Sequence, residues 1–89
     1  MTSRELRIVN EKGLHARASA KFVECVEGFD ACAEVTKDGM TVSGDSIMGL
    51  LMLGAARGTS ISLSTSGTEA DALADALEAL VANRFGEDR

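Results

Sequence analysis

Aromatic residues are scarce in this sequence: they make up 3% of the 89 residues, and tryptophan and tyrosine are missing altogether. Proteins that hold single-stranded nucleic acid stack its bases on aromatic side chains, so this composition argues against that class. Basic residues are also in the minority, because nine lysines and arginines stand against 14 acidic residues, for a net charge of −5. An acidic surface repels a phosphate backbone, and we therefore expect no nucleic-acid partner.

Cysteine and histidine are equally scarce, which bears on metal binding. The chain has two cysteines, Cys25 and Cys32, and one histidine, His15. Their spacing matches no zinc-binding pattern, and together they fall short of a structural zinc site. We expect no metal and no cofactor. We also expect both thiols to be reduced and buried, where they act as small apolar side chains.

Long apolar stretches are missing too. The longest apolar-rich run, residues 47–56, is interrupted by glycines. It is shorter than the roughly 20 residues that a membrane-spanning helix needs. Residues 1–5 lack the apolar core of a secretory signal peptide. These two features predict a soluble cytoplasmic protein that does not insert into a membrane.

The sequence does contain enough apolar material for a folded core. Hydrophobic residues make up 45% of the chain, too many for a disordered protein, and 89 residues predict one domain spanning 1–89. Alternation of apolar and polar residues indicates strands, and helical spacing of apolar residues indicates helices. In chain order these patterns predict a strand at 5–9, a helix at 16–27, strands at 31–36 and 40–43, a helix at 47–53, a strand at 60–64 and a helix at 69–83. This β-α-β-β-α-β-α order is typical of a two-layer α+β sandwich.

Several local features are expected within these elements. Asp-Gly at 38–39 predicts a tight hairpin turn. Ser66 or Thr68 is expected to cap the last helix, and residues 86–89 are expected to form a frayed tail. The spacing of the large apolar residues in that helix predicts a buried stripe of Leu73, Leu77, Leu80 and Val81.

His15 stands at the start of the predicted 16–27 helix, after a polar loop that ends in Gly13. The first N–H groups of a helix lack partners within the helix, and together with the helix dipole they form a site for an anion. A neutral imidazole, whose ordinary pKa is roughly 6.5, can attack phosphorus. Arg17 adds a fixed positive charge and donors that suit phosphate. The pattern favours a phosphoryl group carried on His15, although on the residues alone a plain helix cap at His15 and a solvated charge at Arg17 remain open.

Two stretches of the chain resemble a known family. Residues 13–17, Gly-Leu-His-Ala-Arg, are similar to the active-site signature of HPr, the histidine-containing phosphocarrier of the bacterial phosphoenolpyruvate-dependent phosphotransferase system. Residues 44–53 resemble the family's second signature, which surrounds a regulatory serine, here Ser46. The separation of the two motifs, the chain length and the order of elements also fit. Residues 28–31 and 50–53 look closer to the nitrogen-related branch of the family than to the sugar-transport branch.

This resemblance implies a fold, a function and a site. His15 would accept a phosphoryl group from enzyme I, as a pros-phosphohistidine, and pass it to an enzyme IIA. The chain would then be a phosphocarrier and not an autonomous enzyme, and nothing in the sequence calls for more than a monomer. Arg17 would stabilise the phosphate charge, with the backbone N–H groups of Ala16, Arg17 and Ala18 as donors. The fold implied is a four-stranded antiparallel sheet in the order 1-4-2-3, with three helices on one face.

One position departs from the family's pattern. The family commonly has proline after the arginine, and this chain has Ala18. Proline in a first turn presets the backbone without removing a hydrogen bond within the helix. Alanine keeps its N–H and is a good helix former. We therefore expect a slightly looser helix start with one more donor for phosphate.

Ser46 and the short helix after it carry the remaining expectations. Ser46 is placed to cap the 47–53 helix, and that role alone would account for it. The resemblance adds regulatory phosphorylation by HPr kinase/phosphorylase. So short a helix cannot bury all its large apolar side chains, and Ile47, Met48 and Leu51 are expected to form an exposed patch where partners dock. Packing of these side chains under a neighbouring loop is the alternative.

Two other classes of function stay open at this stage. If His15 were the nucleophile of an enzyme, the chain would need a substrate pocket and a second acid or base. If His15 were only a helix cap, the chain would be a small interaction domain that is not phosphorylated.

Overall fold

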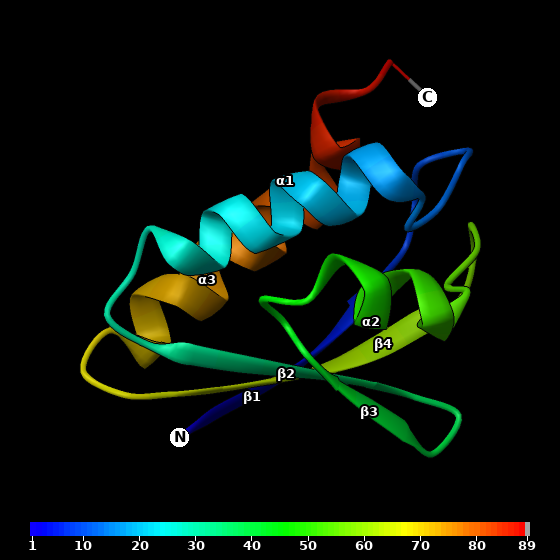
Figure 1. The fold of residues 1–89 in the computed structure, drawn as a ribbon. Helices are drawn as coiled ribbons and strands as arrows, with labels where there is room; N and C mark the ends of the chain where they lie inside the picture. Colours follow the sequence, from blue (N-terminus) through cyan, green and yellow to red (C-terminus); the bar gives the residue numbers. More distant parts are fainter. Residues whose placement is uncertain (89) are drawn as a thin grey trace.

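The fold is known from a computed structural model, which describes residues 1–88 of the chain (Figure 1). Within this range the elements follow the predicted β-α-β-β-α-β-α order, and a short 3-10 helix, η1, comes after them. None of the helices within residues 1–88 combines the length and the apolar character that crossing a bilayer requires. The bounds are β1 Thr2–Arg7, α1 Ala16–Glu27, β2 Cys32–Lys37, β3 Met40–Ser43, α2 Ile47–Leu53, β4 Ser60–Ser66, α3 Ala70–Ala82 and η1 Arg84–Gly86.

The strands of residues 1–88 form one sheet in the order β1-β4-β2-β3, and each neighbouring pair is antiparallel. Figure 1 shows α1, α2 and α3 together on one side of this sheet. The opposite face is polar, and on β4 it carries Ser60, Ser62 and Ser64. The predicted α+β sandwich of two layers, with strand order 1-4-2-3 and three helices on one face, is confirmed.

The core lies between the two layers. Alternation along β4 places Ile61 and Leu63 on the inner face, where Leu6 of β1 and Val35 of β2 are their register partners. All four side chains are buried, as the strand patterns predict. Leu80 is partly buried, so the predicted stripe on α3 is narrower than expected. The helices complete the core with Ala18, Phe22, Val23 and Val26 of α1 and Leu73, Leu77 and Val81 of α3.

Several ends of elements differ from the predictions: β2 lies one residue later along the chain, β4 ends two residues later, and α3 is one residue shorter at each end. β1 begins at Thr2 and ends at Arg7, because it pairs with β4 along the whole register from Thr2–Thr65 to Arg7–Ser60. The N-cap of α3 is Glu69, and the predicted cap at Ser66 or Thr68 is wrong. The Glu69 carboxylate accepts the backbone N–H of Asp30 at 2.6 Å, so it ties the helix start to the loop before β2.

The prediction of a frayed tail at 86–89 is wrong for the residues that the structure describes. η1 turns the chain back onto the molecule, and the Phe85 side chain is fully buried in the core. The Glu87 side chain is only 15% exposed. An aromatic side chain placed just after α3 has enough apolar area to hold this segment down. Arg89 lies outside the described residues.

The two cysteines are both free thiols in residues 1–88. The prediction that both are buried is wrong for Cys32, which is exposed because β2 turns Ala33 and Val35 inward instead. Cys25 packs against the core from α1 and is partly buried. Burial disfavours its thiolate and raises the pKa of the Cys25 thiol.

Candidate functional site

The loop before α1 is held in place by a glycine. Gly13 has a φ of +65°, and a Cβ there would lie 2.4 Å from the carbonyl oxygen of Ala55. Only glycine fits both conditions. The next residue, Leu14, donates its N–H to that same oxygen at 2.8 Å, and its side chain is buried. These contacts fasten the loop to the segment after α2 and deliver His15 to the start of α1.

His15 is the N-cap of α1, as the sequence predicts. Its backbone is extended, with φ −77° and ψ −178°, and its carbonyl oxygen accepts the N–H of Ser19 at 2.8 Å. The N–H groups of Ala16, Arg17 and Ala18 come before this first bond of the helix. The N–H of Arg17 points back at the His15 ring and donates to Nδ1 at 3.3 Å. One ring nitrogen therefore faces the positive end of the helix dipole.

The other ring nitrogen meets an acidic residue from the far end of the chain. Nε2 of His15 is hydrogen-bonded to Oε2 of Glu87, and the His15 side chain is 26% exposed. Nδ1 needs a free lone pair to accept the Arg17 N–H, so in the neutral ring the proton lies on Nε2. That proton is donated to the Glu87 carboxylate. Nδ1 is thus left as the nucleophilic nitrogen.

The Glu87 carboxylate is held by a second partner, Asn10. Nδ2 of Asn10 donates to Oε1 of Glu87 at 3.0 Å and to the carbonyl oxygen of Gly13 at 2.8 Å. Asn10 is fully buried, and among residues 1–88 its Oδ1 has no hydrogen-bond partner. A buried acceptor without a partner costs free energy. The two hydrogen bonds that Nδ2 donates offset this cost and keep the Asn10 side chain in place. It links the loop of His15 to the carboxylate that contacts the ring.

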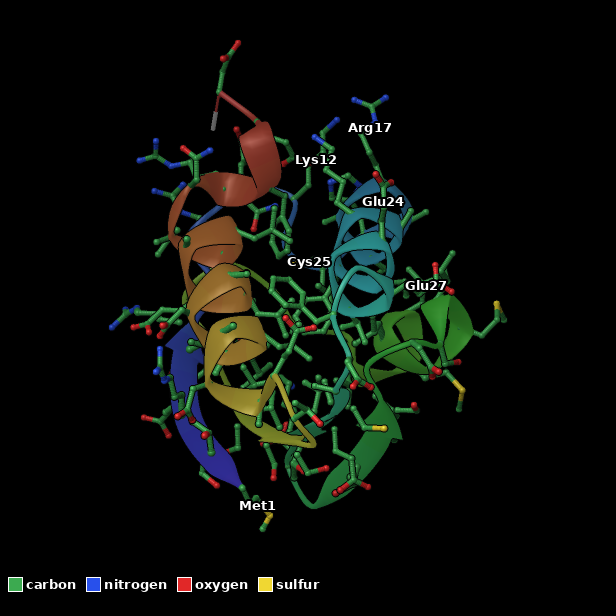
Figure 2. The ribbon with its side chains drawn as sticks, turned by 90° about the vertical axis from the view of Figure 1, so that its left-hand side faces the viewer. Met1, Lys12, Arg17, Glu24, Cys25 and Glu27 are labelled. Carbon is green, nitrogen blue, oxygen red and sulfur yellow. The ribbon has the colours of Figure 1, made fainter. Side chains whose placement is uncertain are left out.

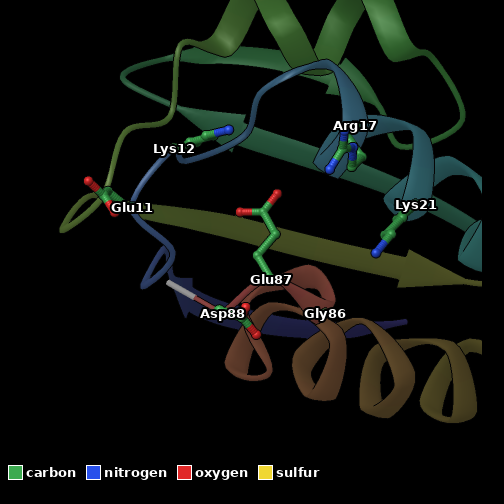
Figure 3. A pocket seen from close by; sticks show the side chains of 7 residues that line it. All are labelled: Glu11, Lys12, Arg17, Lys21, Gly86, Glu87 and Asp88. Carbon is green, nitrogen blue, oxygen red and sulfur yellow. The ribbon is translucent and has the colours of Figure 1, made fainter.

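Positive side chains surround this carboxylate. Lys12, Arg17, Lys21 and Glu87 line a cleft of about 540 Å³, and Figure 3 shows the Glu87 carboxylate pointing into it between Lys12 and Arg17. In Figure 2 Lys12 and Arg17 lie at the same end of the molecule, with the Arg17 side chain extending outward. Desolvation works against the charged form of Glu87. The hydrogen bonds from Asn10 and His15, with the charges of His15 and Lys12, outweigh it and lower the pKa of the Glu87 carboxyl.

Ser46 and the predicted docking residues lie on α2. Ser46 is the N-cap, as predicted, and its Oγ accepts the N–H of Gly49 at 3.1 Å. Ile47 and Met48 are exposed, at 40% and 69%, whereas Leu51 is only partly exposed. Met52, which the predicted docking patch did not include, is 67% exposed.

Sequence reasoning missed Glu87 and Asn10. The hydrogen bond between His15 and Glu87 joins residues 72 positions apart, and no local pattern announces such a contact. The one available signal was Phe85, an aromatic residue directly before the segment 86–89 that was expected to be frayed. The polar residues around Asn10 predict a solvated loop, although the Asn10 side chain is completely buried.

Comparison with known proteins finds relatives that match nearly the whole length of the chain. The family model described as "PTS HPr component phosphorylation site" matches residues 2–83. The chain is 44% identical to phosphocarrier protein HPr of Cupriavidus necator over 87 residues, which cover 98% of each chain. It is 40% identical to phosphocarrier protein NPr of Shewanella violacea over 84 residues, covering 94% of this chain and 92% of that one.

Solved structures of similar fold are also HPr proteins. The crystal structure of HPr-C-His from Thermoanaerobacter tengcongensis superposes with a TM-score of 0.95 at 36% identity, and the match covers 100% of both chains. A family match over nearly the whole chain and a shared fold at this level of identity point to one conclusion. The chain belongs to the HPr family of phosphocarrier proteins of the phosphotransferase system.

Proposed function

We propose that the chain carries a phosphoryl group on Nδ1 of His15, which it accepts from phosphorylated enzyme I and passes to an enzyme IIA. The observation that carries this proposal is the N-cap geometry, because the Nδ1 lone pair faces the first N–H groups of α1. Membership of the HPr family supplies the phosphotransferase system as the setting. Residues 1–89 would act as one domain, in the cytoplasm, where phosphoenolpyruvate is made.

The transfer needs one bond to form and one to break. Nδ1 of His15 gives its lone pair to phosphorus, while the bond from phosphorus to the donor atom breaks and the donor keeps that electron pair. No proton has to leave the ring first, because Nδ1 is already unprotonated. The N–H of Arg17, which faces Nδ1 in the free protein, would turn to a phosphate oxygen together with those of Ala16 and Ala18. The exposed Arg17 guanidinium adds positive charge on the same turn.

The surroundings of His15 favour a carrier over an autonomous enzyme. The ring is 26% exposed at the edge of an open cleft. The carboxylate beside it, Glu87, is held by Asn10 and by Nε2 of His15, on the side of the ring away from Nδ1, so it is not aimed at a water molecule attacking a phosphoryl group on Nδ1. A phosphoryl group at this site would therefore last long enough to reach a partner. All these side chains come from one copy of the chain, so a monomer suffices.

The exposed side chains of α2 support a docking surface next to His15. Ile47 and Met48 are exposed and Leu51 forms the edge, and Met52 extends the apolar area. The segment just after α2 holds the His15 loop through the carbonyl oxygen of Ala55. A partner that bound this surface would be close to the phosphoryl group. Unbranched methionine side chains adapt their shape, which suits successive binding of two different partners.

Phosphorylation of Ser46 by HPr kinase/phosphorylase would act on this docking surface. Ser46 comes directly before Ile47 and Met48, and a phosphate there would place about two negative charges beside them. We expect Ser46→Asp to weaken binding to enzyme I severalfold with little loss of stability. Ser60→Asp is the matched control, because Ser60 is exposed on the opposite face of the sheet. Equal binding by both variants would contradict regulation through Ser46.

The first test is phosphorylation of the purified chain with enzyme I and phosphoenolpyruvate, with wild type beside His15→Ala. We expect intact mass to show one acid-labile phosphate on wild type and none on the variant. Absence of label on wild type, under conditions that charge a known HPr, would refute the proposal. Purified enzyme IIA proteins of the sugar and nitrogen branches can then be offered as acceptors, since relatives named HPr and NPr both match the chain.

A further inference from the structure

We propose that Glu87 is a positioning residue for phosphoryl transfer at His15. Its carboxylate holds the ring with the proton on Nε2 and balances the positive charge that the ring acquires when Nδ1 takes the phosphoryl group. This inference rests on the proposed carrier function and adds a residue outside both sequence signatures of the family.

The geometry around the carboxylate supports a positioning role. Oε2 of Glu87 accepts from Nε2 of His15, and Oε1 accepts from Nδ2 of Asn10 at 3.0 Å. The Glu87 side chain is 15% exposed, so the pair is largely shielded from water. Asn10 also holds the carbonyl oxygen of Gly13 at 2.8 Å. The carboxylate is therefore fixed relative to the same loop that sets the position of His15.

The backbone on which Glu87 stands is fixed as well. Phe85 is fully buried, and its carbonyl oxygen accepts from Nζ of Lys21 at 2.7 Å. The N–H of Glu87 donates to the carbonyl oxygen of Arg84 at 2.9 Å, which closes a turn just after η1. Burial of the Phe85 ring and these bonds bring an acidic residue of the last segment to the start of α1. A surface residue that meets His15 by chance would have no such support.

The charge balance of the reaction explains what the carboxylate contributes. The form of the ring that can react is the neutral one, with a lone pair on Nδ1 and a proton on Nε2. When Nδ1 bonds to phosphorus, no proton leaves, so the ring becomes an imidazolium that still carries the Nε2 proton. The hydrogen bond from Nε2 to Glu87 then becomes a bond between two charged groups, and such bonds are about twice as strong as neutral ones. The carboxylate therefore stabilises the phosphorylated ring, and the transition state that leads to it, more than the free ring.

The cations of the cleft favour the charged form of the Glu87 carboxylate and leave its hydrogen bond to Nε2 of His15 in place. Lys12 attracts the Glu87 carboxylate through the cleft, while Lys21 is bonded to the carbonyl oxygen of Phe85. The backbone N–H of Arg17 lies on the Nδ1 side of the ring, where the phosphoryl group would be placed. The site thus has an anion beside Nε2 and the positive end of a helix dipole beside Nδ1. This is the order of charges that a phosphorylated imidazolium needs.

A phosphodonor that needs no protein partner tests this inference directly. Potassium phosphoramidate supplies the phosphoryl group: Nδ1 bonds to phosphorus, the phosphorus–nitrogen bond breaks and ammonia leaves. The test compares wild type with Glu87→Gln, which keeps a hydrogen-bonding side chain and loses only the charge. Asp88→Asn is the matched control, because it removes the same charge from an exposed neighbouring residue of the same cleft.

The sign of the effect separates the two roles that Glu87 could have. Phosphoramidate is an anion, so a carboxylate that only contributed negative charge would slow the reaction, and Glu87→Gln would be faster than wild type. We expect Glu87→Gln to be slower by about tenfold, the difference between a charged and a neutral hydrogen bond. Asp88→Asn should stay within about twofold of wild type, because Asp88 is exposed and no hydrogen bond joins it to the ring within residues 1–88, so only screened charge effects remain. An unchanged or higher rate for Glu87→Gln overturns the inference.

A spectroscopic measurement on the unphosphorylated protein gives an independent result. The chain has one histidine, so its ring nitrogens and the Nε2 proton can be assigned without ambiguity by NMR. We expect a downfield Nε2 proton in wild type and in Asp88→Asn, and its loss or upfield shift in Glu87→Gln. A signal that is the same in all three proteins contradicts the contact. If wild type takes no phosphate from either donor, the carrier function itself fails, whereas labelled wild type with equal rates in Glu87→Gln rejects only the role of Glu87.

Discussion

Replacing Gly13 by alanine should destabilise the protein and displace the loop that presents His15. Alanine at a φ of +65° costs about 1–2 kcal/mol in backbone strain. Its methyl group would also lie 2.4 Å from the Ala55 carbonyl oxygen and 2.9 Å from Cα of Ala56, both backbone atoms that cannot rotate away. The loop must shift, and the bond from the Leu14 N–H to Ala55 is lost with it, for roughly another 1 kcal/mol. We expect Gly13→Ala to lose about 2–3 kcal/mol in total.

Gly39→Ala provides a matched control for this prediction. Gly39 has a φ of +82°, also in the left-handed region, but a Cβ there would meet no atom within 4 Å in the described structure. It should therefore show only the strain of about 1–2 kcal/mol. Urea unfolding gives the free energies, and hydrogen exchange of the Leu14 amide reports on its bond to Ala55. Equal losses in the two variants, with the Leu14 amide still protected, would refute the argument from close approach.

Other parts of the molecule give further predictions. Phe85→Ala should lower the free energy of unfolding by about 3–5 kcal/mol in urea titrations, because it leaves a cavity where a fully buried ring was. A loss under about 1 kcal/mol would mean that the last segment does not pack as described. The Glu87 carboxyl has a lowered pKa in the folded protein, so its contribution to stability is present above the ordinary value of about 4.3 and is lost as the pH falls through the folded-state value. Unfolding free energies of wild type and Glu87→Gln should therefore converge in acid, and a gap that stays constant from pH 6 to pH 3 argues against the contacts of the Glu87 carboxylate with Asn10 and His15. Cys32 should react with a thiol reagent faster than Cys25, because Cys32 is exposed and burial raises the pKa of Cys25; mass spectrometry of partly labelled protein identifies the order.

Much of the fold follows from local patterns in the sequence. Periodicity predicted α1 and α2 with the bounds that the structure has, and the Asp38-Gly39 turn has positive φ at both residues, as a tight hairpin requires. Helix caps were harder to predict than helix bounds. Ser46 was predicted as a cap because it stands directly before a short helix. Glu69 was not predicted, because its carboxylate bonds to the N–H of Asp30, which is distant in the sequence.

The candidate site divides in the same way. His15 and Arg17 belong to one short stretch, and the start of a helix gives them a physical role that the sequence alone suggests. Asn10 and Glu87 could not be predicted, because their contact exists only after the last segment has folded back across α1. A run of polar residues after α3 reads as a solvated tail, and the one apolar residue in it, Phe85, decides otherwise.

The pairing of His15 with Glu87 has a consequence for synthesis on the ribosome. The two residues are 72 positions apart, so the histidine, its helix and most of the sheet leave the exit tunnel long before the acidic partner is made. A nascent chain therefore passes through a period in which α1 and its N-cap can form while Nε2 faces water. Phosphoryl transfer at His15 would therefore reach its full rate only after Glu87 has been made and has folded back onto the start of α1.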